Sequence, residues 1–182
     1  WNIGPGDAVF TTPFTYVATA EVISLLGATP IFVDVYESTF NIDCEKLELA
    51  IQNTISEGKL TPKAIIPVDL FGLPARYRLI EEIAKKYDLK VIEDAAQSFG
   101  ASVGDRKVGT FGDVAATSFY PAKPLGCYGD GGAIFTNDDE LAHTLRGIVN
   151  HGMYERYHHD VVGVNSRLDS IQAAVLRAKL PL

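Results

Sequence analysis

The chain has 182 residues, of which 47% are hydrophobic and 21% are charged, and its formal net charge at pH 7 is −7. This composition is typical of a globular protein, and no apolar run approaches the roughly 20 residues that a membrane-spanning helix needs. Net negative charge without a Lys/Arg-rich stretch disfavours nucleic acid as a partner. A small anionic ligand is compatible with it, because such a site needs only local cations or helix N-termini.

The two cysteines, Cys44 and Cys127, form neither a C-x-x-C pair nor a metal-binding spacing. We therefore expect free thiols, no bound metal and a reducing, cytoplasmic location. The chain begins at Trp1 without a recognisable signal peptide, and a helical pattern continues almost to its last residue. Both ends look cut, so we expect residues 1–182 to form a single domain of a longer protein.

Short apolar runs rich in β-formers alternate with amphipathic segments along the chain. In chain order they predict strand 8–12, helix 16–26, strand 30–35, a helix capped by Asp43, strand 63–68, helix 76–87, strand 90–93, strands 114–119 and 133–136, helix 138–148 and helix 168–179. The first helix is expected to end at a glycine and to bury an apolar face formed by Ala18, Val22, Leu25 and Leu26. The second helix is expected to bury Leu47, Ala50, Ile51 and Ile55.

Strands that alternate with helices predict an α/β fold in which helices cover both faces of a mostly parallel sheet, an α/β/α sandwich. In such sheets ligands bind beyond the carboxyl ends of the strands. Residues that immediately follow a predicted strand are therefore the first candidates for chemistry.

Asp94 comes directly after the apolar strand 90–93. A carboxylate at such a place needs a cationic or donor partner, and a protonated pyridine nitrogen is one such partner. The small Ala95 and Ala96 would let a flat ring approach, and Gln97 could donate a hydrogen bond to a ring oxygen. Taken alone, Asp94 is better explained as a cap of the turn that follows.

Lys123 lies just past the predicted strand 114–119, between two prolines and ahead of a glycine-rich loop. A lysine amine held beside a cofactor could form a Schiff base, and Ser118 could donate to a phosphate. A lone loop lysine is more often a solvated charge, and a glycine-rich loop also fits a plain hairpin. The order and spacing of the whole set distinguish the two interpretations.

That set resembles the DegT/DnrJ/EryC1/StrS family of sugar aminotransferases. The resemblance rests on segment 93–98 (EDAAQS), on Ser118 followed five residues later by Lys123, and on segment 129–134 (GDGGAI). Segments 12–20 (TPFTYVATA) and 163–174, with GVNSRLD followed by QAA, agree with it. The likeness extends from about Gly4 to the end of the chain, and it implies part of the large domain of a pyridoxal-phosphate-dependent transferase of fold type I.

The resemblance implies a role for each matching residue. Lys123 would hold pyridoxal phosphate covalently and then act as general acid and base. Asp94 would pair with the pyridine nitrogen, Gln97 would contact the phenolic oxygen of the ring, and Ser118 would bind the phosphate. The implied reaction moves an amino group from an amino acid, with glutamate the expected donor, to a nucleotide-linked keto-sugar.

Two further residues complete the implied site. Tyr16 occupies the position whose aromatic ring stacks on the cofactor, although packing at a helix start explains it as well. Asn165 would reach the cofactor phosphate of the partner subunit, which implies a homodimer. Segment 123–128 (KPLGCY) resembles members that aminate 3-keto sugars of surface polysaccharides.

The chain departs from the family pattern at Asp69, where many relatives have histidine, and this leaves substrate contacts near that position open. The N-terminal segment that supplies backbone N–H groups to the phosphate and the smaller C-terminal domain are both expected to lie outside residues 1–182. A chain of this extent could bind the cofactor poorly.

Three alternatives remain. A nicotinamide-dependent dehydrogenase would need a G-x-G-x-x-G turn after the first strand, whereas segment 4–6 (GPG) precedes that strand. A related pyridoxal-phosphate-dependent sugar dehydratase would have histidine in place of Lys123. A non-catalytic or regulatory homologue would not need Lys123, Asp94 and Gln97 together.

Overall fold

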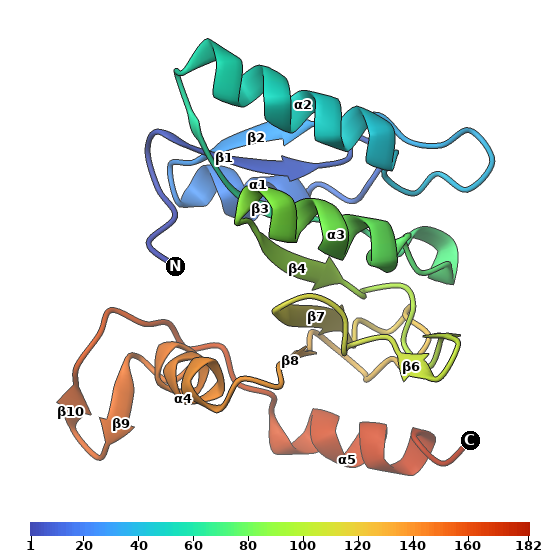
Figure 1. Cartoon of the computed structure of the whole chain (residues 1–182). Helices are drawn as coiled ribbons and strands as arrows, with labels where there is room; N and C mark the ends of the chain where they lie inside the picture. The colour runs from blue at the N-terminus through green and yellow to red at the C-terminus, as the bar shows by residue number, and fades with distance from the viewer.

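The computed structural model describes all residues 1–182 and contains one central six-stranded sheet (Figure 1). Its strands lie in the order β2-β1-β3-β4-β7-β8. Five of them are parallel, and β8 runs antiparallel to β7. The strands are β1 (Asp7–Thr11), β2 (Thr29–Phe32), β3 (Thr61–Ile66), β4 (Lys90–Asp94), β7 (Val114–Ser118) and β8 (Gly132–Phe135). The prediction of a mostly parallel sheet is confirmed.

Five α-helices flank this sheet: α1 (Ala18–Leu25), α2 (Cys44–Glu57), α3 (Tyr77–Tyr87), α4 (Asp139–Ile148) and α5 (Ser170–Lys179). The other elements are short: the 3-10 turn η1 (Leu70–Gly72), the ribbon of β5 (Ser102–Val103) with β6 (Arg106–Lys107), and the ribbon of β9 (Met153–Glu155) with β10 (His158–His159). α4, α5 and the β9–β10 ribbon gather beside the β8 edge of the sheet (Figure 1). None of the helices combines the length and apolar character that crossing a membrane requires.

The core has two layers because side chains alternate between the faces of each strand. On one face, Ala8 and Phe10 of β1 join a 16-residue cluster with α2 and α3. On the other face, Val9 packs with Ile23 of α1 in a smaller cluster. Helices therefore cover both faces of the sheet, as the sequence predicted for an α/β/α sandwich.

Helix ends follow the local sequence where a capping side chain is present. The carboxylate of Asp43 accepts hydrogen bonds from the N–H groups of Glu45 and Lys46 at the start of α2, at 2.9 and 3.2 Å. Asp138 does the same for α4. Past the end of α1, Gly27 adopts φ +76°, a conformation that glycine tolerates best.

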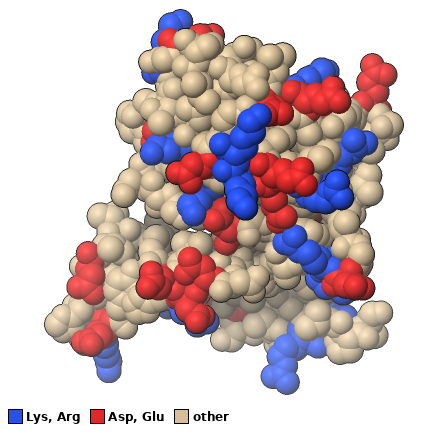
Figure 2. Space-filling view, viewed as in Figure 1, with Lys and Arg blue, Asp and Glu red and all other residues tan.

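Charged side chains of both signs are interspersed on the surface seen in Figure 2. Several of them form ion pairs between elements. The Lys86 ammonium of α3 lies 2.6 Å from the Glu48 carboxylate of α2, and Lys90 of β4 lies 3.1 Å from Asp113. Such exposed pairs contribute little stability individually.

The prediction of the buried face of α1 is wrong. The helix begins at Ala18 rather than at residue 16, and it buries Thr19 and Ile23. Val22, Leu25 and Leu26 are 48%, 78% and 58% exposed. The polar Thr19 can be buried because its hydroxyl donates a hydrogen bond to Asp94 of β4. The helix therefore packs on the sheet with the side that carries Thr19 and Ile23 instead of its more apolar side.

Three further expectations need correction. In α2, Leu47 and Ile51 are buried as predicted, but Ile55 is 51% exposed, and Ile51 is the last buried residue of the helix. The last helix begins at Ser170 instead of at residue 168, after Asp169 in an extended N-cap conformation. The strand expected over 30–35 ends at Phe32.

Candidate active site

Asp94 is the last residue of β4, at the carboxyl edge of the sheet. Its Oδ2 atom accepts a hydrogen bond from the Thr19 hydroxyl at 2.8 Å, and its Oδ1 atom accepts one from the Ala96 N–H at 3.2 Å. None of the six ion pairs of the chain includes Asp94. The half-buried carboxylate is thus oriented by neutral donors and has no cationic partner, which suits it to bind a cation of a ligand.

Ser118 is the last residue of β7, on the same face as Asp94. Asp94 is in register with Ala116, and Ser118 follows Ala116 by two residues, so their side chains point to the same side of the sheet. The Ser118 oxygen accepts a hydrogen bond from the Tyr120 N–H at 3.2 Å, which leaves the hydroxyl proton free to be donated. The exposed Ala116 leaves the surface between the two residues open.

Lys123 lies in the loop that connects β7 to β8. Its backbone N–H donates to the Tyr120 carbonyl at 2.8 Å, and its half-buried side chain makes no ion pair or hydrogen bond in the chain. The loop closes where the Cys127 N–H donates to the Phe119 carbonyl at 2.7 Å. A side chain at Gly126 would place its Cβ 2.5 Å from the Pro121 oxygen, so the tight turn requires glycine. Lys123 is therefore carried by a constrained loop, and its amine has no partner within the chain.

Gln97 follows β4 after the Ala95-Ala96 step. Its Oε1 atom accepts a hydrogen bond from the Phe71 N–H at 2.7 Å. This bond fixes the orientation of the amide, because only the oxygen can accept, and it leaves the NH₂ group as a donor for another molecule. Phe71 lies within η1 and has φ +57°, an uncommon conformation for a residue with a side chain.

The structure does not bring all six predicted residues together. Asp94, Ser118, Gln97 and Lys123 occupy the carboxyl edge of β4 and β7 or the segments that follow it. Tyr16 is 73% exposed and lies one turn before Thr19, the residue that contacts Asp94. Asn165 is exposed and lies in the segment between β10 and α5, where its backbone forms an isolated antiparallel β-bridge with Asn150. Its side-chain oxygen accepts a hydrogen bond from Arg167.

Asp69 lies close to this edge, but its carboxylate points into the core. Its backbone N–H donates to the Asp94 carbonyl at 3.1 Å, whereas its side chain is fully buried. The carboxylate accepts hydrogen bonds from the Ala75 N–H at 2.9 Å and from the hydroxyls of Tyr77 and Ser98 at 2.7 and 2.8 Å. Burial raises the pKa of Asp69, and these three donors oppose that effect. Asp69 thus stabilises the carboxyl edge through its backbone bond to Asp94, while its carboxylate contacts only groups of the core.

Sequence reasoning missed two residues that support the site. Thr19 reads as part of a helix start, and its contact with Asp94 spans 75 positions. Glu93, adjacent to Asp94 but on the opposite face of β4, is 0% exposed and accepts hydrogen bonds from the N–H groups of Gly109 and Phe111 at 2.8 and 2.9 Å. Burial raises the pKa of Glu93 to about 7, with Asp69 as an additional cause. The sequence could have indicated the burial of Glu93, because Glu93 lies two residues after the buried Val91 and therefore points to the same face of β4.

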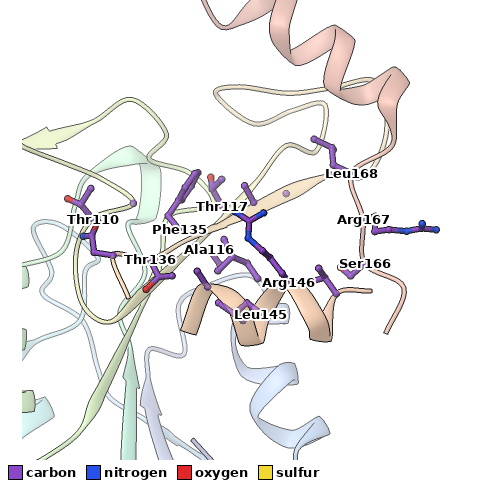
Figure 3. A pocket seen from close by; sticks show the side chains of 18 of the residues that line it. Thr110, Ala116, Thr117, Phe135, Thr136, Leu145, Arg146, Ser166, Arg167 and Leu168 are labelled. Carbon is purple, nitrogen blue, oxygen red and sulfur yellow. The ribbon is translucent and has the colours of Figure 1, made fainter. Parts of the chain in front are cut away.

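A cavity of about 850 Å³ lies between β8 and α4 (Figure 3). Leu145 and Arg146 line it from α4, and the Arg146 side chain projects into it towards the strands, whereas Arg167 points away (Figure 3). Ala116 and Thr117 of β7 also line this cavity, but none of the six predicted site residues does. The cavity and the predicted site thus share the strand β7 but no site residue.

Comparison with known proteins shows that the chain is similar to aminotransferases. A model of the DegT/DnrJ/EryC1/StrS aminotransferase family matches residues 1–181. The chain is 57% identical, over its whole length, to 48% of the UDP-2-acetamido-2-deoxy-3-oxo-D-glucuronate aminotransferase of Pseudomonas aeruginosa. It is 50% identical, over 99% of its length, to 47% of the UDP-N-acetyl-3-dehydro-α-D-glucosamine 3-aminotransferase of Acidithiobacillus ferrooxidans.

Solved structures agree. A DegT DnrJ EryC1 StrS aminotransferase from Brucella abortus superposes with a TM-score of 0.97 at 59% identity, covering 98% of this chain and 48% of that one. S. venezuelae DesV in complex with a ketimine intermediate has a TM-score of 0.90 at 44% identity, covering 98% and 46%. The chain spans about half the length of the relatives it matches. It belongs to the DegT/DnrJ/EryC1/StrS aminotransferase family.

Proposed function

We propose that the protein is a pyridoxal-phosphate-dependent aminotransferase that moves an amino group from an amino acid, with glutamate as the expected donor, to a nucleotide-linked keto-sugar. The observation that carries the proposal is that two groups at or just beyond the carboxyl edge of the sheet have no oppositely charged partner in the chain. The Asp94 carboxylate is oriented but has no cation, and the Lys123 amine has no partner. Each is the complement of one group of the cofactor: its ring nitrogen and its carbonyl carbon.

The other residues fit the remaining groups of pyridoxal phosphate. The free hydroxyl proton of Ser118 suits a phosphate oxygen, and the Gln97 NH₂ group suits the phenolic oxygen of the ring. The exposed Ala116 leaves room for a flat ring beside Asp94, and Tyr16 supplies an exposed aromatic ring before α1. When bound, the cofactor acts as an electron sink and carries the amino group between the two substrates.

In this proposal the residues of the chain bind, orient and move protons. The Lys123 amine would hold the cofactor covalently, and when free it would take up and return the proton that moves between carbon atoms, as general base and then general acid. The Asp94 carboxylate would keep the ring nitrogen protonated. Asp69 takes no direct part, because all its contacts lie in the core.

The names of similar proteins favour C3 of the sugar as the position that receives nitrogen. The relatives from Pseudomonas aeruginosa and Acidithiobacillus ferrooxidans are named for 3-oxo and 3-dehydro UDP-sugars. A Streptomyces venezuelae relative, 45% identical, is named as a transaminase for a dTDP-3-amino sugar. We propose a UDP-linked 3-keto sugar as the first substrate to test.

We also propose a homodimer in the cytoplasm, in which Asn165 acts on the site of the partner subunit. The exposure of Asn165, whose side chain contacts only Arg167 in the chain, is compatible with such a role. Sedimentation of the full-length protein tests the assembly. If Asn165→Ala lowers affinity for pyridoxal phosphate in a dimeric protein, the shared site is supported, whereas unchanged affinity would count against it.

The decisive experiment uses the full-length protein and two lysine variants. Wild type mixed with pyridoxal phosphate should develop the absorbance band of a lysine-linked cofactor, and with a UDP-linked 3-keto sugar and glutamate it should release 2-oxoglutarate. Lys123→Ala should lose turnover by at least the roughly 10²–10⁴-fold that general acid–base help contributes. Lys85→Ala, which removes an exposed, unpaired lysine of α3, is the matched control and should behave as wild type.

Three outcomes would contradict the proposal. Turnover retained by Lys123→Ala would remove the lysine from the reaction. Wild type that never develops the absorbance band would favour the alternative of a non-catalytic homologue. Loss of water from the sugar without release of 2-oxoglutarate would indicate a dehydratase instead.

A further inference from the structure

The Thr19 hydroxyl holds the carboxylate that is proposed to face the cofactor. Thr19 is 6% exposed and its Oγ1 atom lies 2.8 Å from Asp94 Oδ2. The other carboxylate oxygen accepts from the Ala96 N–H at 3.2 Å, at the long end of the hydrogen-bond range. Of the two hydrogen bonds that set the rotation of the Asp94 side chain, the one from Thr19 is therefore the shorter.

A second threonine defines the direction of this contact. The hydroxyl oxygens of Thr15 and Thr19 lie 2.9 Å apart. The Thr19 hydroxyl donates to Asp94, and because a hydroxyl has only one proton, Thr15 donates to Thr19. Hydrogen bonds in such a chain polarise one another, which strengthens the contact with the carboxylate.

We propose that Thr19 is a positioning residue of the aminotransferase, which orients the Asp94 carboxylate towards the ring nitrogen of the cofactor and so helps to keep that nitrogen protonated. This inference rests on the proposed function. The physical basis is that the half-buried Asp94 carboxylate has no cationic partner in the chain. If the Thr19 hydroxyl is removed, the carboxylate rotates towards the donor that remains, the Ala96 N–H. Because Thr19 belongs to α1 and Asp94 to β4, the same contact also joins the helix to the sheet.

The test replaces the hydroxyl while keeping the shape. In the full-length protein, Thr19→Val should lower amine transfer about 10- to 100-fold, the range expected for losing a hydrogen bond to a charged group. Thr19→Ser, which keeps the donor, should stay within about threefold of wild type on the same grounds. Thr54→Val is the matched control, because the Thr54 hydroxyl bonds only the Ala50 carbonyl within α2 and lies in another helix.

A readout that packing alone would not move is the ¹⁵N resonance of the pyridine nitrogen in protein loaded with ¹⁵N-labelled pyridoxal phosphate. In Thr19→Val the resonance should shift towards that of the unprotonated ring, whereas Thr19→Ser and Thr54→Val should retain the wild-type position. Thr15→Val, which leaves the Thr19–Asp94 contact in place, should shift it in the same direction by less. This variant and Thr19→Ser keep the inference testable even if Thr19→Val does not fold.

The outcomes separate this inference from the function on which it rests. Wild type that fails to bind the cofactor would overturn both. Wild type that binds and transaminates, with Thr19→Val unchanged in rate and in ¹⁵N resonance, would overturn the role of Thr19 alone. A Thr19→Ser variant as impaired as Thr19→Val would also overturn it, because the hydroxyl would then not be the relevant group.

Discussion

Replacement of Glu93 by glutamine should change how the stability of the protein depends on pH. The Glu93 side chain is 0% exposed, and burial raises its pKa from the ordinary value of 4.5 to about 7. The folded state therefore binds this proton more tightly than the unfolded state does. Stability from this group is fully present below pH 4.5 and is lost as the pH rises to about 7.

The size of the effect follows from the difference of 2.5 between 7 and 4.5. At about 1.36 kcal/mol per pKa unit, the loss amounts to roughly 3 kcal/mol across this pH interval. Asp69 interacts with Glu93 and its pKa is also raised, so the two carboxyl groups titrate as a pair. Glu93→Gln removes one titrating group, at the cost of one acceptor for the Gly109 or Phe111 N–H, about 1–3 kcal/mol.

The measurement is urea unfolding of wild type and Glu93→Gln in the full-length protein at several pH values between 4.5 and 8, followed by circular dichroism. The difference in unfolding free energy between the two proteins cancels the groups that they share. It should change by about 3 kcal/mol in favour of the variant as the pH rises. Glu37→Gln, which alters an exposed carboxylate, is the matched control. A difference for Glu93→Gln that is constant over this range would refute the reasoning.

Two other substitutions test the packing around the site. Gly126→Ala places a Cβ 2.5 Å from the Pro121 oxygen, so it should displace the loop of Lys123 and weaken the absorbance of the lysine-linked cofactor; an unchanged spectrum would show that the loop tolerates a side chain. Ile80→Ala removes a fully buried side chain of α3 and should lower the unfolding free energy by about 2–5 kcal/mol with little effect on the cofactor spectrum, as denaturant titration can check.

Much of the fold was predictable from local pattern. Strand and helix periodicity predicted the alternation of elements, and Asp43 and Asp138 marked two helix starts that the structure confirms. These features depend on neighbours within a few residues, which is why a single sequence contains them. The candidate residues Asp94 and Lys123 were found for a related reason, since Asp94 lies at the end of β4 and Lys123 lies in the loop that follows β7.

Other features depend on which surfaces meet, and periodicity does not report that. The pattern of α1 predicted burial of Val22, Leu25 and Leu26, but the sheet receives the side of the helix that carries Thr19, because a donor there finds the Asp94 carboxylate. An apolar stripe indicates what can be buried, whereas a partner distant in sequence decides what is buried. By itself the sequence determined the alternating elements, the residue types at the strand ends and, through alternation along β4, the shared face of Val91 and Glu93. Only the tertiary structure decided that the Asp69 carboxylate is held in the core and that Asp94 contacts Thr19, because those contacts depend on donors from elements distant in the sequence.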